Sequence, residues 1–386
     1  MPTSAAFPRH IRMGGGALDE LGAVIDALSL QRPLVVTDPY LTASGAAARV
    51  INLLEAAGKA TALFDRTVAD PTTASLEQGV QALLAHRADS IVGFGGGSPM
   101  DTAKALGVLA LQPGPMRRFK APSSYAGPAL PIVAIPTTAG SGSEATQFTV
   151  ISDSETNEKM LCPGLSFLPI AAIVDFELTM TMPPRLTADT GVDALTHAVE
   201  AYVSRRANPI SDGLALSAIR LIATHLKQAY RDGSDAAARA GMMAAATQAG
   251  MAFSNSSVAL VHGMSRPIGA HFHVAHGLSN AMLFPAVTAF SIAGAPQRYA
   301  DCARAYGVAD AATNDDTAAR AFVDAIAELC SELEVPTPRS YGIDRAAWQS
   351  LIPLMAEQAV ASGSPANNPV IPGLPEIEAL YTQIFG

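Results

Sequence analysis

The sequence predicts an α/β unit with a parallel sheet over residues 1–182, followed by an all-helical unit over residues 183–386. In the first part, short apolar runs rich in β-branched residues alternate with helical patterns. In the second part, long helical patterns follow one another, and the pair Pro183-Pro184 marks the change. The length of 386 residues also favours two domains, because single hydrophobic cores stop growing at about 250–300 residues.

Five apolar runs in the first part are predicted to form strands. They lie at residues 32–38, 60–65, 89–97, 130–138 and 170–177. Helices are expected between them at residues 42–57, 74–86 and 100–111. Because the runs are apolar from end to end, we expect a parallel sheet that is covered on both faces.

The second part is predicted to be helical throughout. Helical patterns cover residues 189–203, 209–230, 236–253, 258–270, 277–293, 318–333, 344–361 and 374–385. Thr187 is expected to act as the N-cap of the first of these helices.

The composition limits the partners that this chain is expected to have. With 49% hydrophobic and 15% charged residues, much surface should be buried, and we expect a homodimer or a higher homo-oligomer. The net charge of −9 comes without a long basic run, so nucleic acid is not an expected partner. No signal peptide or uncharged apolar stretch of membrane-spanning length is recognised, and the three cysteines have no CxxC spacing. We therefore expect a cytoplasmic protein that does not bind membranes.

A glycine-rich loop joins a predicted strand to a predicted helix in "SIVGFGGGSPMDTAKALG". Gly95, Gly96, Gly97 and Ser98 lie in this loop. Glycines let backbone N–H groups approach a diphosphate, and the helix that follows adds positive potential at its N-terminus. Such a loop alone is a weak signal, because an ordinary tight turn has the same composition.

A second loop of this kind, "PTTAGSGSE", follows the next strand and contains Thr137 and Thr138. Ligands of open α/β sheets bind beyond the carboxyl ends of the strands, so two such loops favour a nucleotide site. Asp38 ends the first predicted strand. Its carboxylate could accept hydrogen bonds from an adenosine ribose and repel a 2′-phosphate, although a solvated turn aspartate is the alternative.

A metal site is predicted from one carboxylate and three imidazoles in the helical part. Asp193 and His197 are four residues apart in "TADTGVDALTHAVEAYV" and so share one face of a helix. His262 lies in a later helical run, and His276 begins another. This donor set suits iron(II) or zinc and leaves room for a substrate.

Five motifs resemble those of the iron-containing, group III alcohol dehydrogenase family. They are "GVDALTHAVEAYVS", "VHGMSRPIGAHFHVAHGLSNAMLFP", "GFGGGSPMDTAKA", "PTTAGSGSE" and "DPTT". The resemblance implies a dinucleotide-binding α/β domain and a helical metal domain, as in dehydroquinate synthase-like folds. It also implies transfer of a hydride between NAD(H) and a small primary alcohol or aldehyde.

The resemblance also implies roles for individual residues. Asp193, His197, His262 and His276 would bind one divalent metal, iron(II) in the first place and zinc as the alternative. The residues expected to contact NAD are Asp38, Gly95, Gly96, Gly97, Ser98, Asp101, Thr137, Thr138, Ser143 and Lys159.

One position departs from the family pattern. Many relatives have a histidine four residues after the third ligand, where this chain has Arg266, and an arginine cannot relay a proton at neutral pH. His271 and His273 are alternative groups for proton transfer, and a water chain through the cofactor ribose is a third alternative. Arg266 could instead select substrates that bear an acidic group, or it could be structural by bridging helices.

Two other functions remain open from the sequence. An NAD- and metal-dependent lyase or cyclase of the dehydroquinate synthase type would use the same cofactors. A metal-dependent hydrolase would use the four ligands and leave both glycine loops without a role.

Overall fold

The computed structural model describes residues 4–156 and 158–386. Within it, Ala6–Thr181 forms a compact α/β unit and Met182–Gly386 forms a compact helical unit. The fold class predicted from the sequence, an α/β unit with a parallel sheet followed by an all-helical unit, is confirmed.

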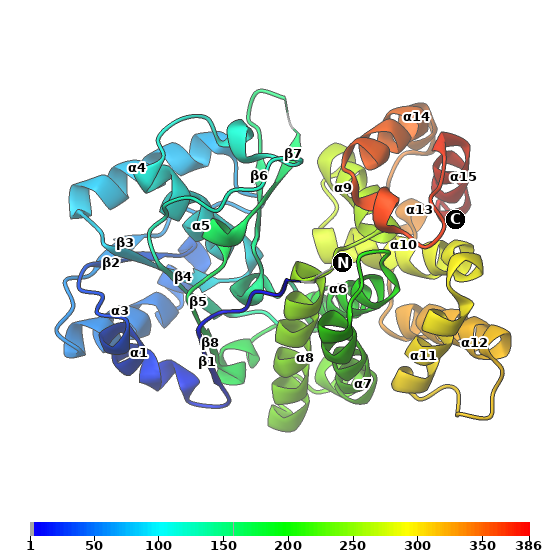
Figure 1. The fold of residues 1–386 in the computed structure, drawn as a ribbon, viewed down its shortest axis with the longest axis horizontal. Coiled ribbons are helices and arrows are strands. Elements are labelled where there is room, and N and C mark those ends of the chain that lie inside the picture. Colours follow the sequence, from blue (N-terminus) through cyan, green and yellow to red (C-terminus); the bar gives the residue numbers. More distant parts are fainter. Residues whose placement is uncertain (1–3, 157) are drawn as a thin grey trace. The chain divides into compact units, whose positions relative to one another are not determined.

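Six parallel strands form the sheet of the α/β unit, in the order β1-β8-β5-β4-β2-β3 (Figure 1). They are β1 (His10–Met13), β2 (Pro33–Val36), β3 (Ala62–Phe64), β4 (Ser90–Gly95), β5 (Ile132–Pro136) and β8 (Ala171–Val174). All five predicted strands are present. The edge strand β1 was not predicted.

Both faces of this sheet are covered by helices. Leu34 and Val36 of β2 pack in one apolar cluster with residues of α4 (Thr73–His86) and α5 (Gly97–Leu111). Val35, which lies between them, packs in a second cluster with residues of α1 (Leu21–Ala27) and α3 (Ala46–Ala56). Successive side chains of a strand point to opposite faces, so β2 is apolar throughout because neither face meets water.

One local prediction in the α/β unit was wrong, and one pair of strands was missed. The helix expected over residues 42–57 is two helices, α2 (Pro39–Ala43) and α3, because Gly45 between them has a φ of 82°. The strands β6 (Phe148–Ser152) and β7 (Lys159–Pro163) form an antiparallel hairpin that was not predicted. Burial alternates along both strands, which is the period expected of a hairpin with one buried face.

The helical unit contains ten α-helices in the described part of the chain. They are α6 (Pro184–Val203), α7 (Pro209–Arg231), α8 (Ala236–Ser254), α9 (Leu260–Phe272), α10 (His276–Ser291), α11 (Pro296–Tyr306), α12 (Asp315–Glu332), α13 (Pro338–Tyr341), α14 (Arg345–Ala361) and α15 (Leu374–Ile384). The eight predicted helices are present, and α11 and α13 were not predicted. In α6, sixteen of the twenty residues are buried, so this helix is central to the unit.

The predicted N-cap of α6 was wrong. The helix begins at Pro184, and Pro183 is its N-cap, because proline fits the first helical position, where its missing N–H is not needed. Thr187 lies inside the helix, and its hydroxyl accepts a hydrogen bond from Arg239 Nη1 at 2.8 Å.

One helical stretch, His276–Gly294, is long and apolar enough to cross a membrane by length and composition. In its most apolar window, 56% of the residues are buried inside the structure. The stretch contains α10, which packs against α6, α9 and α12. Its apolar composition is therefore explained by its place in the core of the helical unit.

Candidate metal centre and nucleotide loops

Four side chains that were predicted to bind metal lie together in the helical unit. Asp193 and His197 come from α6, His262 comes from α9, and His276 begins α10. One ligand atom of each lies within 4.8 Å of those of the other three. The fold thus joins three separate helices at one point.

The spacing of these atoms is close to that of ligands around a single divalent cation, and slightly wider. The Nε2 atoms of His197, His262 and His276 lie 3.8, 3.6 and 3.8 Å from Asp193 Oδ1. Donor atoms held at about 2.0–2.2 Å around a tetrahedral metal lie about 3.3–3.6 Å from one another. The side chains of Asp193 and His262 are 6% and 4% exposed, whereas that of His276 is 42% exposed. The group is therefore accessible on the side of His276.

The rings of the site are held by stacking. The ring of His197 stacks on that of Phe253 of α8, with a centroid separation of 4.3 Å, and on that of His262, with a separation of 4.5 Å. Stacking against two neighbouring rings restricts rotation of the His197 ring. The sequence did not place Phe253 in this role.

The charge balance of the site favours an ionised carboxylate. Burial alone would raise the pKa of Asp193. The interactions of its carboxylate with His197, His276 and His262 have the opposite and larger effect, so the pKa lies well below its usual range. Burial lowers the pKa of His262, but the carboxylates of Glu200 and Asp193 outweigh it, so its pKa is raised. Asp193 is therefore available as an anionic ligand.

Asn280 is a polar neighbour of the site that the sequence did not reveal. Its Nδ2 lies 2.7 Å from Asp193 Oδ1, 3.1 Å from His262 Nε2 and 3.3 Å from His276 Nε2. Its buried Oδ1 has no hydrogen-bond partner among the described residues. An amide donor therefore faces the same lone pairs that would bind a cation. The signal in the sequence is its position four residues after His276, which places both on one face of α10.

The three residues predicted to act in catalysis have different surroundings. Arg266 Nη1 donates to Ser364 Oγ at 3.0 Å. Burial lowers the pKa of Arg266 to about 10, although the negative charge of Glu200 acts to raise it. His271 Nε2 contacts Gln358 Oε1 of α14 at 2.8 Å. His273 is exposed and is the C-cap of α9, with a φ of 54°. None of them belongs to the metal-binding group, and their catalytic roles stay predictions.

The two glycine loops meet at the carboxyl edge of the sheet. The first follows β4 and leads into α5, and the second follows the adjacent parallel strand β5. A Cβ atom built on Gly96 would lie 3.5 Å from Thr138 Cγ2, and one built on Gly97 would lie 3.5 Å from Ser141 Cβ. Gly96 is also the N-cap of α5. The backbone of Gly96 and Gly97 and the hydroxyl of Thr138 thus lie next to a helix N-terminus, where a phosphate binds well.

Other residues predicted to contact NAD have protein partners in this structure. Asp38 Oδ1 accepts from the N–H of Leu41 and caps α2. Asp101 accepts from Ser143 Oγ at 2.8 Å and from the N–H of Val150 at 2.9 Å. The Asp101 contacts connect α5 to the second loop and to β6, and direct contact of either aspartate with NAD stays a prediction.

Lys159 and Ser98 are joined through one aspartate. Lys159 Nζ forms an ion pair with Asp70 at 2.9 Å, and Ser98 Oγ accepts from the N–H of Asp70 at 3.3 Å. Asp70 is the first residue of the "DPTT" motif. The motif therefore connects the hairpin to the glycine loop.

The sequence did not reveal a buried lysine beside these loops. Lys104 is fully buried, and its Nζ donates to Ser143 Oγ, Thr146 Oγ1 and Phe148 O at 2.8 to 2.9 Å. Burial lowers its pKa to about 8, although the carboxylate of Asp101 acts against this. The second loop is thus attached to α5 through one ammonium group.

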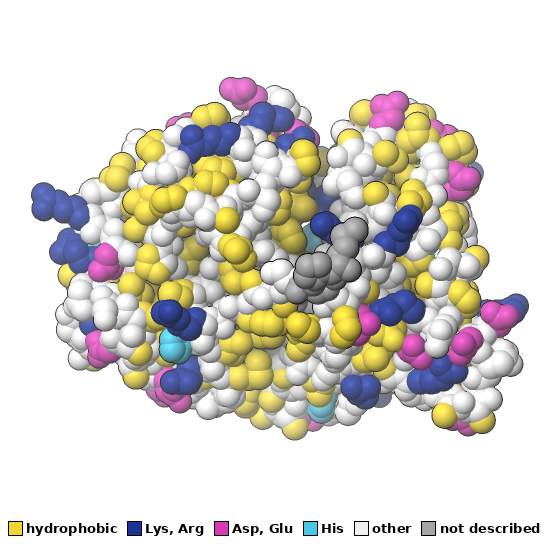
Figure 2. Space-filling view, in the orientation of Figure 1, with side chains coloured by type: hydrophobic (Ala, Val, Ile, Leu, Met, Phe, Trp, Pro, Cys, Tyr) yellow, Lys and Arg dark blue, Asp and Glu magenta, His cyan; other side chains and the backbone are white. Residues whose placement is uncertain are grey.

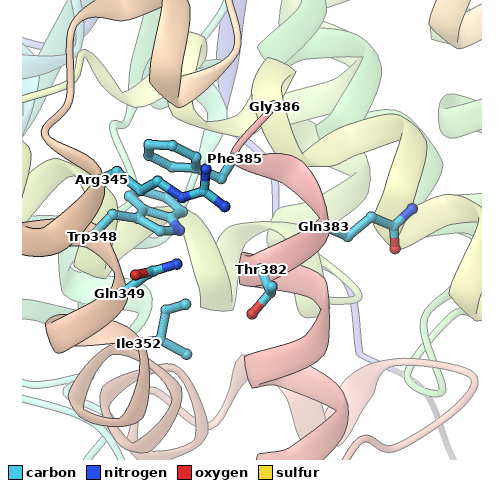
Figure 3. Close-up of a pocket in the computed structure, with 8 residues that line it drawn as sticks. All are labelled: Arg345, Trp348, Gln349, Ile352, Thr382, Gln383, Phe385 and Gly386. Carbon is cyan, nitrogen blue, oxygen red and sulfur yellow. The ribbon is translucent and has the colours of Figure 1, made fainter.

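A pocket in the helical unit lies between α14 and α15 (Figure 3). Its volume is about 130 Å³. It is lined by Arg345, Trp348, Gln349, Ile352, Thr382, Gln383, Phe385 and Gly386. None of the predicted site residues lines it, so it is not the metal centre.

Comparison with known proteins identifies relatives over the whole chain. The model of the iron-containing alcohol dehydrogenase family matches residues 8–176, and the model of the C-terminal part of that family matches residues 187–385. The 1,3-propanediol dehydrogenase of Klebsiella pneumoniae is 36% identical over 375 residues, which cover 96% of each chain. A crystal structure of a 1,3-propanediol oxidoreductase matches with a TM-score of 0.95 and 35% identity over 100% of both chains. The structure of a sulfoacetaldehyde reductase from Bifidobacterium kashiwanohense in complex with NAD+ matches with a TM-score of 0.88 and 26% identity, covering 100% of this chain and 99% of that one.

Proposed function

Since the chain belongs to the iron-containing alcohol dehydrogenase family, we propose that it uses iron(II) to interconvert a small primary alcohol and its aldehyde. It is an NAD-dependent alcohol dehydrogenase or aldehyde reductase. The observation that carries the proposal is the group of Asp193, His197, His262 and His276, with one ligand atom of each within 4.8 Å of the others. Zinc accepts the same donors and is the alternative cation.

The bound cation and the residues of the chain would contribute different parts of the reaction. When bound, a divalent cation acts as a Lewis acid that lowers the pKa of a coordinated hydroxyl from about 15.7 to about 7. Asp193 supplies the one negative charge among the four ligands, so a dication would keep a net positive charge. The glycine loops would hold the diphosphate of NAD, and the nicotinamide would supply or accept the hydride of the alcohol–aldehyde interconversion.

The substrate class is proposed to include molecules with an acidic group. Among the described residues, the Arg266 guanidinium donates a hydrogen bond to Ser364 Oγ at 3.0 Å, and so to a neutral group. The charge of Glu200 offsets the cost of burying this guanidinium only in part, so an anionic ligand beside it would be favourable. Arg266 lies one turn after the ligand His262 on α9. The similarity to a sulfoacetaldehyde reductase is compatible with this proposal.

The experiment that tests the function follows NADH during turnover. The purified chain, loaded with iron(II), is mixed with NADH and small aldehydes, and absorbance in the near ultraviolet is compared with product formed. Loss of NADH equal to the alcohol formed is expected of a dehydrogenase. Product formation without a change in NADH would instead indicate a cyclase or a hydrolase, which the named relatives do not favour.

A homo-oligomer and a cytoplasmic location are also proposed. The high apolar fraction, 49%, supports self-association, which light scattering of the purified chain can measure.

On the face drawn in Figure 2, acidic and basic side chains are interspersed, and that face has no extended basic patch. Together with the net charge of −9, this face does not favour nucleic acid as a partner.

A further inference from the structure

We infer that Glu200 is a positioning residue of the metal centre, because its carboxylate holds His262 in the tautomer whose Nε2 carries the free lone pair. Glu200 lies on α6, three residues after the ligand His197. The inference rests on the proposed metal site and adds to it a residue that does not itself bind the cation.

The Glu200 carboxylate is buried and accepts three hydrogen bonds. Its Oε2 lies 2.6 Å from His262 Nδ1 and 2.9 Å from the backbone N of Ala259. Its Oε1 lies 2.6 Å from the backbone N of Val261. The residue is 3% exposed, and among the described residues its ion-pair contact is with His262.

These contacts determine where the imidazole carries its proton. An ionised carboxylate only accepts hydrogen bonds, and a backbone N–H only donates. With Glu200 ionised, the short contact to His262 therefore requires a proton on Nδ1. On the other edge of the ring, Nε2 faces the amide donor of Asn280 at 3.1 Å, which also requires a lone pair there. A ring protonated on Nδ1 presents Nε2 to a cation.

The same carboxylate fixes the backbone that carries this ring. Ala259 is the N-cap of α9 and has no side chain that could cap the helix. The first N–H groups of a helix lack partners within the helix, and here Glu200 accepts from the N-cap residue and from Val261 in the first turn. A negative charge at a helix N-terminus is also favourable. Glu200 thus couples the ligand helices α6 and α9.

The test is Glu200→Gln in the full-length chain, prepared free of metal and titrated with iron(II) or zinc(II) against a competing chelator. Glutamine has one acceptor oxygen in place of two, so its NH2 group must face an N–H donor. We expect the metal affinity to fall about 10- to 100-fold, the usual cost of losing such a partner. Glu200→Asp, which keeps a carboxylate, should recover part of this loss.

A matched control separates positioning from stability. Asp189 is also buried on α6, and its carboxylate pairs with Arg185 instead of a ligand. Asp189→Asn makes the same chemical change, and we expect it to lower the thermal stability of the metal-free chain while changing the metal affinity much less than Glu200→Gln does. The inference is overturned if Glu200→Gln binds metal as tightly as the wild type, or if Asp189→Asn loses as much affinity. If the wild type binds neither cation, both the metal function and this inference are refuted.

Discussion

Asp193 Oδ1 lies 3.6 Å from His262 Nε2, and both atoms are acceptors when the carboxylate is ionised and the imidazole is protonated on Nδ1. Two buried acceptors at this distance repel each other unless positive charge or a donor lies between them. In this structure, Asn280 Nδ2 contacts both atoms, at 2.7 and 3.1 Å. Asn280 therefore relieves this repulsion in the structure, and the two lone pairs that it contacts are those that a cation would use.

Asp193→Asn should abolish stoichiometric cation binding, because it removes the only carboxylate among the four ligands. NADH binding should remain close to that of the wild type, since the glycine loops belong to the α/β unit. Metal analysis after gel filtration and a fluorescence titration with NADH measure the two properties. A variant that keeps one cation per chain would show that the metal lies elsewhere.

Gly96→Ala should weaken NADH binding without destabilising the chain. The added Cβ would meet Thr138 only at an ordinary contact distance of 3.5 Å, and the φ of −72° suits alanine. A methyl group at this position would keep a phosphate from the backbone. Loss of one hydrogen bond to a charged group costs about 1.5–3 kcal/mol, or about 10- to 100-fold in affinity.

Gly95→Ala is the control for the glycine loop. Its φ is +146°, and its Cβ would lie 2.6 Å from Pro99 Cγ, so this variant should lower the melting temperature. If Gly96→Ala binds NADH as well as the wild type does, the loop does not hold the diphosphate.

Local patterns allowed much of this structure to be predicted from the sequence. The i, i+4 spacing of Asp193 and His197 and the apolar runs of the central strands depend on neighbouring residues alone. β1 was missed because its sequence, HIRM, is short and contains the polar residues His10 and Arg12. It therefore lacks the continuous apolar run of the central strands. Glu200 was missed because its partners, Ala259, Val261 and His262, are distant in sequence and meet it only when α6 and α9 pack together.

Arg266→Met should lower kcat/KM for aldehydes that bear a carboxylate or sulfonate by about 10- to 100-fold, since a charge-assisted hydrogen bond is lost. Neutral aldehydes of similar size should be affected much less, because methionine keeps an unbranched side chain. Steady-state kinetics with paired acidic and neutral substrates measure the difference. Equal losses on both would assign Arg266 a structural role through Ser364.

Lys104→Met should destabilise the α/β unit, because it leaves Asp101 buried without its neighbouring ammonium. The substitution also removes the donor of the hydrogen bonds to Ser143, Thr146 and Phe148. Each buried acceptor left unpaired costs about 1–3 kcal/mol, which denaturant unfolding at neutral pH would detect. Retained stability would show that the hydrogen bonds of Lys104 to the second loop contribute little.

The wild type and Lys104→Met should also differ in their pH dependence. The pKa of Lys104 is lowered from 10.5 to about 8 in the folded chain, so between these values the unfolded state binds more protons. The cost of burying the charge is present below pH 8, and the free energy of unfolding rises as the pH increases from about 8 to 10.5. Unfolding midpoints at several pH values should show this rise in the wild type relative to Lys104→Met. Parallel pH profiles would contradict the lowered pKa.

The most direct measurement is turnover of NADH by the wild-type chain after its metal has been removed with a chelator and the chelator dialysed away. The metal-free chain is expected to bind NADH and to be inactive, and activity should return in proportion to added iron(II) or zinc(II) up to one cation per chain. Undiminished turnover in a sample shown by elemental analysis to contain no transition metal would contradict the role assigned to Asp193, His197, His262 and His276.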